Sequence, residues 1–356
     1  MEFLDELEQK PALDPEDMYH KIIHLPEQVM QAYQSAKIHG SETILASEVK
    51  LQQVVIAGMG GSAMAGDIAR AAFGQKIPVS VVKDYELPYV DDKTLVLCLS
   101  YSGNTQETLS CFKQAIQKGC AIAAVTSGGK LRELCTGKYP WVELPDGLPP
   151  RSAIGYLFFG LLRLLESYTL IPDHSATVKS LVANLIRKAG AICRQNPLES
   201  NLAKSSAREI RGKIPVIYAS CSQLYPLAYR WKCQFNENAK YPAFCHTLPE
   251  MNHNEIEGWE ETELNKGLIV IILRHLQEAG VIGRRLQAFK KLLHRNSTPF
   301  LEFYVEGDKL IERIFSLIYL GDMISYYLAL LQEVDPTRID YIDYLKAALT
   351  GGIEND

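Results

Sequence analysis

Three hydroxyl side chains and a glycine lie together in the segment Ser100-Tyr-Ser-Gly-Asn-Thr105. The apolar residues 94–99 before it read as a buried parallel strand, and residues 106–117 after it have helical composition. Hydroxyls and free backbone N–H groups at a helix N-terminus favour a bound anion, because the positive end of the helix dipole points there. An ordinary Ser/Thr N-cap with a turn glycine has the same composition, so this segment alone leaves both interpretations open.

A glycine-rich turn follows an earlier expected strand at residues 54–57. In Gly58-Met-Gly60-Gly61-Ser62-Ala63, the serine hydroxyl stands where the loop would approach a compact phosphate or sugar hydroxyls. The spacing also fits G-x-G-x-x-A, the dinucleotide fingerprint, and Asp84 lies near the expected position of a ribose-binding carboxylate. A glycine turn without any ligand is the third interpretation. The presence of a further hydroxyl-rich loop at residues 100–105 favours a sugar phosphate over a dinucleotide as the ligand.

Charged and polar residues further along the chain supply groups for catalysis. Arg151 precedes an expected helix, where it would complete an anion site or form a salt bridge at a domain edge. The densest polar regions are Asn236-Glu237-Asn238-Ala239-Lys240 and Asn252-His253-Asn254-Glu255. A carboxylate close to a histidine can perform general acid–base chemistry. Glu237 as a solvated helix residue and His253 as a loop histidine satisfied by its neighbours remain the alternatives.

A zinc site is the other chemistry that this region suggests. It holds suitable ligand types, but their spacing fits no common zinc-finger or hydrolase pattern, so we expect no metal at Cys245, His246, Glu250 and His253.

The composition describes an ordinary globular protein. The 356 residues are long for one core and favour two domains, and the net charge of −5 argues against nucleic acid or an anionic membrane as the main partner. Eight cysteines without a CxxC pair are expected to be mostly buried free thiols in a reducing compartment. The acidic N-terminus lacks a signal-peptide core, and no apolar run approaches the roughly 20 residues that span a bilayer. We therefore expect a cytoplasmic protein.

Alternating strand and helix signals predict a parallel sheet covered on both faces in each half of the chain. Strands are expected at residues 54–57, 78–82, 94–99, 121–126, 141–144, 215–219, 268–273 and 299–304. Helices are expected at residues 62–73, 106–117, 152–168, 176–195, 281–294, 315–332 and 339–349, with a further helix from after 222 to about 239.

Taken together, these motifs resemble the bifunctional phosphoglucose/phosphomannose isomerases of the sugar-isomerase (SIS) superfamily. The resemblance extends from about residue 51 to 349. It depends on the order of the two loops, Pro150-Arg151, the two asparagine-rich segments, and the ending Asp335-Pro-Thr followed by Ile342-Asp-Tyr-Leu-Lys346. The Ser-x-Ser-Gly-Asn-Thr loop also occurs in non-catalytic sugar-phosphate regulators, whereas the motifs of the second half are much narrower.

The resemblance implies an α/β fold of two tandem flavodoxin-like SIS domains, each with three α/β/α layers around a parallel sheet, at residues 1–185 and 186–356. The first would carry an N-terminal helical extension and the second a C-terminal catalytic helix. It also implies a homodimer whose active sites lie at the subunit interface. No cofactor is required, because the reaction moves a proton between two carbons of the sugar. The expected substrates are glucose 6-phosphate, fructose 6-phosphate and mannose 6-phosphate.

By the same resemblance, the substrate phosphate binds to Ser100, Ser102 and Thr105, and the sugar lies beside Gly60, Gly61 and Ser62. Arg151 would be the family's active-site arginine, and Glu237 its catalytic base. His253 would be the ring-opening histidine, contributed across the dimer, and Lys346 a lysine near the ring oxygen. A threonine-like group linked to mannose 6-phosphate falls among residues 337–340 without a fixed position. A non-catalytic sugar-phosphate-binding protein and an NAD(P)-dependent oxidoreductase are the alternative functions.

Overall fold

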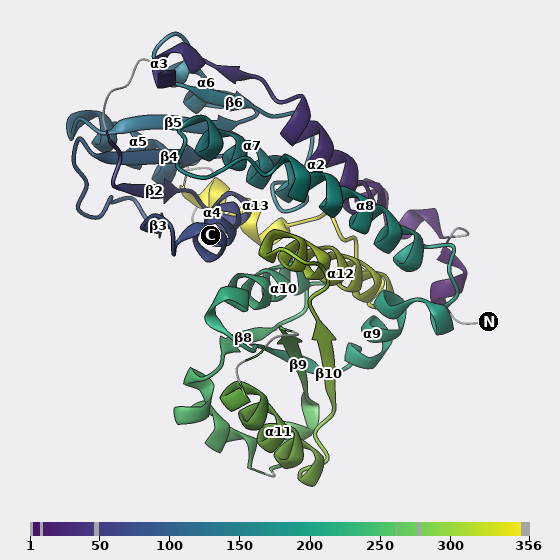
Figure 1. The fold of residues 1–356 in the computed structure, drawn as a ribbon. Coiled ribbons are helices and arrows are strands. Elements are labelled where there is room, and N and C mark those ends of the chain that lie inside the picture. The colour runs from purple at the N-terminus through teal and green to yellow at the C-terminus, as the bar shows by residue number, and fades with distance from the viewer. Residues whose placement is uncertain are drawn as a thin grey trace.

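The computed structural model describes residues 3–7, 10–45, 50–260, 262–275, 278 and 280–349. Its two β-sheets lie in different parts of the molecule, and helix α12 (Leu310–Leu331) runs between them (Figure 1).

The first sheet has the strand order β1-β6-β5-β4-β2-β3, and all neighbours are parallel except the antiparallel pair β1 and β6. The parallel strands β3-β2-β4-β5-β6 follow the flavodoxin order, in which the chain reverses direction across the sheet between β2 and β4. The classic dinucleotide fold would place β4 beyond β3 instead. The strands are β1 (Ile38–His39), β2 (Gln53–Ala57), β3 (Val79–Val82), β4 (Thr94–Leu99), β5 (Ala121–Thr126) and β6 (Trp141–Glu143).

Helices cover both faces of this sheet. Alternate strand residues point to opposite faces, and the apolar residues on each face are buried by a different set of helices. Ile56 and Leu97 belong to the hydrophobic cluster that includes α4 and α7, while Val55 and Val96 belong to a separate cluster with α5 and α6. The helices of this half are α1 (Met18–Ile23), α2 (Leu25–Gln34), α3 (Ser41–Leu45), α4 (Gly60–Phe73), α5 (Gln106–Gln117), α6 (Gly129–Cys135), α7 (Ile154–Ser167) and α8 (Ser175–Ile192).

The second sheet is parallel throughout, with the order β10-β9-β7-β8. Its two faces are also covered separately: Ile217 joins the cluster that includes α10 and α12, and Tyr218 packs against Phe289 of α11. The elements are α9 (Leu202–Ile210), β7 (Ile214–Ala219), α10 (Tyr225–Glu237), β8 (Phe244–Thr247), β9 (Leu268–Arg274), α11 (Gly280–Arg295), β10 (Phe300–Tyr304), α12 and α13 (Asp340–Leu349).

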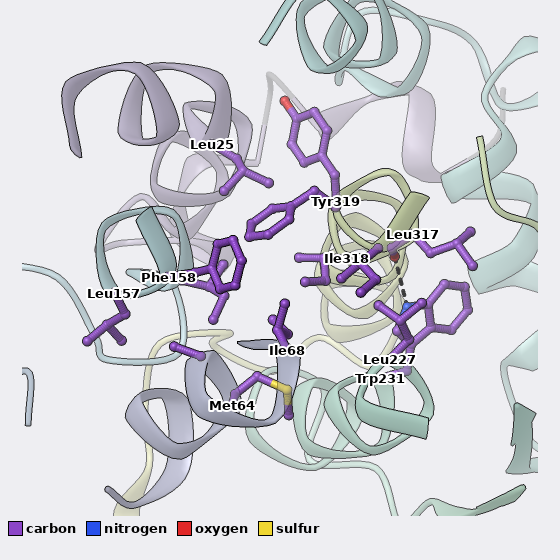
Figure 2. Packing of buried hydrophobic residues seen from close by; sticks show 14 of the residues in the cluster. Leu25, Met64, Ile68, Leu157, Phe158, Leu227, Trp231, Leu317, Ile318 and Tyr319 are labelled. Carbon is purple, nitrogen blue, oxygen red and sulfur yellow. Dashed lines mark hydrogen bonds between the residues drawn. The ribbon is translucent and has the colours of Figure 1, made fainter. Parts of the chain in front are cut away.

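One hydrophobic core joins the two halves around α12. Figure 2 shows side chains of α4, α7 and α10 meeting those of α12, with Phe158 and Ile68 on one side and Trp231 on the other. The Phe158 and Phe315 rings lie 5.2 Å apart, and Trp231 Nε1 donates a hydrogen bond to the Leu317 carbonyl at 2.9 Å. The two sheets are therefore held by a shared core.

Helix α12 corrects one expectation about apolar segments. Among the described helices, it is the one long and apolar enough, at 22 residues, to cross a membrane by length and composition. Its most apolar window is buried entirely within the protein, so it serves as a core helix. The expectation of no apolar segment of this length was therefore wrong. Glu312, Arg313 and Asp322 divide the sequence of α12 into shorter apolar runs, which conceal its full length.

The expected α/β class with parallel sheets in both halves is confirmed, and each expected strand is present within one or two residues. The sequence did not predict the strands β1 and β8 or the helix α9. All eight cysteines are free thiols, but the expectation that most are buried was wrong: only Cys98, Cys111 and Cys135 are. The expected domain division at residue 185 falls inside α8 and stays a prediction.

The contact between α10 and α12 gives a stability prediction at Gly321. A Cβ atom there would lie 2.1 Å from Trp231 Nε1, so Gly321→Ala must displace the indole ring and its hydrogen bond to Leu317. We expect a loss of about 2–4 kcal/mol in the free energy of unfolding, measured by urea denaturation.

Gly190→Ala in α8 is the matched control, because a Cβ atom there meets no atom within 4 Å. It should stabilise the protein by about 0.5–1 kcal/mol through helix propensity. Equal effects of the two substitutions would contradict the packing argument.

Candidate functional site

The two hydroxyl-bearing loops of the sequence come together where the first sheet reverses its strand order. The loop after β2 carries Ser62 and the loop after β4 carries Ser100–Thr105, and ligands of open α/β sheets bind at this switch point. The backbone N–H of Tyr101 donates a hydrogen bond to Ser62 Oγ at 3.2 Å. A contact between these two loops is therefore built into the fold.

The Ser100–Thr105 loop has little freedom to move. Gly103 adopts φ +70°, and a Cβ atom there would lie 1.8 Å from the Gly128 carbonyl oxygen. Ser100 Oγ and Thr105 Oγ1 lie 2.9 Å apart, and the Thr105 side chain does not cap α5. An ordinary N-cap therefore does not explain this loop. Ser102 is exposed and its Oγ accepts a hydrogen bond from the Asn104 N–H at 3.3 Å.

The same two loops fix the segment that carries Arg151. Tyr101 Oη donates to the Pro145 carbonyl at 2.6 Å and accepts from the Leu148 N–H at 3.2 Å. On the other side, a Cβ atom on Gly61 would lie 2.5 Å from the Pro150 carbonyl oxygen. The absence of a side chain at 61 thus lets the backbone before Arg151 approach the N-terminus of α4.

Arg151 is 5% exposed, and the other half of the chain satisfies most of its guanidinium group. Nε donates to Asn238 Oδ1 at 2.7 Å, and Nη2 donates to the carbonyls of Pro336 and Thr337 at 2.8 and 2.9 Å. Nη1 lies 3.7 Å from Glu237 Oε2, too far for a hydrogen bond. Among the described residues, Nη1 makes no hydrogen bond, so it is the nitrogen left for a substrate oxygen.

Glu237 is the last residue of α10, and its side chain is 30% exposed. Its carboxylate faces the guanidinium group of Arg151, whose preceding backbone packs on Gly61. Burial lowers the pKa of Arg151, and the charge of Glu237 opposes that shift. Arginine nonetheless remains charged in proteins, so Arg151 provides a fixed positive charge next to the carboxylate.

Lys240 connects the end of α10 to the C-terminal segment. Its Nζ donates to the carbonyls of Glu237 and Asp335 at 2.9 and 2.7 Å, and to that of Asn238 at 3.4 Å. Burial, followed by the nearby charge of Arg151, lowers the pKa of Lys240 to about 8. This lysine is thus a structural link whose charge changes near neutral pH.

The C-terminal segment places the buried residue Thr337 against Arg151. Thr337 is 8% exposed, and its Oγ1 has no hydrogen-bond partner among the described residues, although its carbonyl accepts from Arg151. Lys346 lies on α13, where it contacts Asp343 at 3.2 Å, and its side chain is 65% exposed. The described residues of α13 are exposed, so Lys346 is not enclosed in a site within one chain.

His253 ends the short 3₁₀ segment Glu250–His253 and is exposed, and its imidazole makes no hydrogen bond or ion pair with the described residues. Glu255 anchors the following segment, because it accepts from Tyr218 Oη at 2.6 Å and lies 3.3 Å from His246 Nδ1. Within the described ranges, no group of three or more His, Cys, Asp or Glu residues could hold a metal ion.

The structure therefore brings together Gly61, Ser62, Ser100, Arg151 and Glu237, and leaves His253 and Lys346 exposed. Sequence reasoning named no role for Asn238 and Lys240, although both lie in the motif that pointed to Glu237. Their side chains bond to residues that are distant in sequence. The sequence signal that could have identified them is their position in the same motif as Glu237.

The second sheet contains a similar switch point. Ser220 Oγ accepts from the His275 N–H at 3.3 Å, much as Ser62 Oγ accepts from Tyr101. Arg313 Nη1 lies 2.7 Å from His275 Nε2, next to this position. The faint repeat in the sequence thus has a structural counterpart.

Comparison with known proteins identifies the family. A model described as the bacterial phospho-glucose isomerase C-terminal SIS domain matches residues 199–349, and the SIS domain model matches residues 49–132. A bifunctional phosphoglucose/phosphomannose isomerase from Caldicellulosiruptor bescii is 40% identical over 93% of this chain and 98% of that protein. One from Thermoplasma acidophilum is 36% identical over 83% of this chain and 89% of that protein.

A solved structure supports the fold independently. The crystal structure of a hypothetical protein from Thermus thermophilus matches with a TM-score of 0.76 at 15% identity, over 98% of this chain and 93% of that one. The strand order, the two SIS-type halves and the relatives that match nearly end to end agree, and this chain belongs to the bifunctional phosphoglucose/phosphomannose isomerase family.

Proposed function

We propose that this protein interconverts glucose 6-phosphate and mannose 6-phosphate with fructose 6-phosphate. The observation that carries the proposal is the pairing of Glu237 with a buried arginine, 3.7 Å away, beside the two loops of the switch point. The relatives named above are called phosphoglucose/phosphomannose isomerases, and they match the chain over most of its length.

The chemistry requires one base and a positive charge. Aldose–ketose exchange moves a proton between C1 and C2 through a cis-enediol, while a hydroxyl proton passes between O2 and O1. A carboxylate on one face can remove the carbon-bound proton and return it. Glu237 performs this transfer, and Arg151 Nη1 stabilises the negative charge that develops on the enediolate oxygens. Glucose and mannose differ only at C2 and share the same enediol, but their C2–H bonds lie on opposite faces of it. For Glu237 to serve both sugars, the enediol must turn its other face at C2 toward the base by rotation about the C2–C3 bond.

The phosphate does not react, but it anchors the sugar. Ser100, Ser102 and Thr105 hold it near the N-terminus of α5, where backbone N–H groups and the helix dipole favour an anion. Gly60, Gly61 and Ser62 lie beside the sugar. Binding energy from the phosphate then fixes C1 and C2 against Glu237, which is how a group remote from the chemistry contributes to turnover.

Ring opening needs a proton delivered to the ring oxygen and another removed from O1, and we assign these steps to His253 and Lys346. The exposure of His253 supports its contribution to the site of a second copy in a homodimer. The exposed face of α13 also supports a dimer, since Tyr341 is 86% and Leu345 61% exposed. The eight free thiols support a cytoplasmic location.

Thr337 is the residue among 337–340 that we assign to mannose acceptance. Its hydroxyl is buried and has no hydrogen-bond partner among the described residues, and its backbone carbonyl accepts from the arginine that faces the base. A hydroxyl in that position can bond to a sugar oxygen whose orientation differs between the C2 epimers.

The activity is tested with fructose 6-phosphate and coupled assays that measure the two aldose products separately. Glu237→Gln should lower turnover by about 10²–10⁴-fold while KM changes little, because the amide keeps the shape but cannot accept the proton. Turnover that survives the substitution would exclude Glu237 as the base, and a wild-type protein that forms neither product would refute the function.

The dimer is tested by mixing two inactive variants, Glu237→Gln and His253→Ala, under conditions that exchange subunits. If each site takes Glu237 from one chain and His253 from the other, half of the chains pair as mixed dimers with one intact site each. Activity should then recover to about a quarter of the wild-type value. No recovery, with exchange verified by mass spectrometry, would place both residues in the same chain's site.

Thr337→Val removes the hydroxyl and keeps the shape. Mannose 6-phosphate activity should fall by about tenfold relative to glucose 6-phosphate activity, the value of one hydrogen bond to substrate. Thr298→Val, at a buried threonine near the second sheet, is the control and should leave the ratio unchanged. A parallel fall for both sugars would assign Thr337 a general role.

Lys240 predicts an alkaline limit to activity. As the ammonium loses its proton above a pKa of about 8, it can no longer donate to three carbonyls, and the segment that holds Arg151 loosens. We expect kcat/KM to fall with an apparent pKa near 8.

Lys240→Arg should shift this alkaline limb upward, since guanidinium stays charged. Because the folded-state pKa lies below the ordinary 10.5, Lys240 itself favours folding more as the pH rises from 8 to 10.5. A loss of folding stability caused by Lys240 therefore cannot account for the fall in kcat/KM above pH 8. An unchanged limb in the variant would show that another group causes it.

A further inference from the structure

Two polar residues in the middle of α12 connect the core of the protein to Arg151. Asp322 is 3% exposed and Ser325 is fully buried, and they lie about one turn apart on a helix that is otherwise mostly apolar. Buried polar groups are costly unless they are hydrogen-bonded. The partners of these two residues therefore indicate what they do.

The first connection passes through Arg230 of α10, which is 2% exposed. Its Nε and Nη2 donate to the two carboxylate oxygens of Asp322 at 3.0 and 2.6 Å. Nη2 also donates to the backbone carbonyl of Arg151 at 2.8 Å. The carboxylate thus fixes the guanidinium group that holds the backbone of Arg151.

The second connection passes through Asn238, just after α10. Ser325 Oγ donates its proton to the Asp322 carbonyl at 2.6 Å, so it must accept from Asn238 Nδ2, which lies at 2.9 Å. The amide oxygen of Asn238 then faces Arg151 Nε at 2.7 Å. One hydroxyl therefore fixes the orientation of the amide that holds the side chain of Arg151.

We propose that Asp322 and Ser325 are positioning residues, which hold the backbone and the side chain of Arg151 so that Nη1 faces the carboxylate of Glu237. This rests on the function proposed above. With Nε and Nη2 occupied by Asn238, Pro336 and Thr337, the orientation of the remaining nitrogen is determined. Small displacements of groups that stabilise a transition state lower turnover more than they lower binding.

Stability alone does not explain this arrangement. Replacing a buried ion pair by apolar residues of similar volume is often neutral or stabilising, because desolvation offsets the attraction. An apolar pair at 230 and 322 would fill the same space between α10 and α12, but it would leave the carbonyl of Arg151 without its donor. A role in positioning predicts that such a replacement preserves folding and lowers catalysis.

The decisive experiment compares Ser325→Ala with Ser206→Ala in the full-length protein. Ser206 is 2% exposed on α9, which packs against α12, and its Oγ bonds to the Leu202 carbonyl at 2.6 Å. It has the same chemistry as Ser325 without a link to Arg151. Ser325→Ala should lower kcat by about tenfold to hundredfold with KM changed less than about threefold, while Ser206→Ala leaves both near wild type.

Inhibition by an anionic analogue of the enediolate supplies a readout that loss of stability would not move. If Nη1 shifts from its place beside Glu237, the analogue loses the positive charge that stabilises it, and its inhibition constant should rise about tenfold to hundredfold in Ser325→Ala but not in Ser206→Ala. The double variant Arg230→Met with Asp322→Leu should show the same rise and the same loss of kcat, with cooperative thermal unfolding retained.

The wild-type measurement separates the two levels of the argument. A wild-type protein without isomerase activity would overturn the proposed function, and the positioning role with it. An active wild type, with Ser325→Ala equal to Ser206→Ala in kcat, KM and the inhibition constant of the enediolate analogue, would overturn the positioning role alone.

Discussion

The buried guanidinium group of Arg151 is the constraint on which the site depends. A charged group that is 5% exposed needs partners for its donors, and this chain satisfies those of Nε and Nη2 from the other half of the sequence. Asn238 and the carbonyls of Pro336 and Thr337 take three of its N–H groups. The segment after the first sheet, the end of α10 and the C-terminal segment must therefore all be in place before the site exists.

This constraint explains why α12 runs between the two sheets. A long helix that is buried on all sides packs against apolar side chains in every direction. Such a helix could itself be apolar throughout. The polar residues in its centre instead bond toward Arg151 through Arg230 and Asn238. The helix that joins the two halves mechanically is also the helix that sets the orientation of the catalytic charge. Apolar packing and catalytic geometry are thus supplied by the same element.

Local sequence patterns predicted the parts of the fold that local physics controls. The fully buried strand β4 and helix α5 were predicted at their observed bounds, because a continuous apolar run and a following polar helix are strong signals. β1 and β8 were not predicted, since each is short, partly exposed and defined by pairing with a distant strand. For the site, residue types pointed to Ser100, Arg151 and Glu237, but the partners of Arg151 lie 87 to 186 residues away and no local pattern reveals them.

The two halves repeat one topology but differ at the switch point. In both, a serine hydroxyl after the first parallel strand accepts from the backbone that follows its neighbour in the sheet, β4 or β9. In the first half, Gly61 and Gly103 let backbone segments approach closely, because a Cβ atom would lie 2.5 Å from the Pro150 carbonyl oxygen or 1.8 Å from that of Gly128. In the second half, charged side chains follow β9 instead: Arg274 is bound to Glu278, and Arg313 Nη1 lies 2.7 Å from His275 Nε2. The second half contributes to catalysis through α10, which supplies Arg230 and Glu237 to a site built on the other sheet.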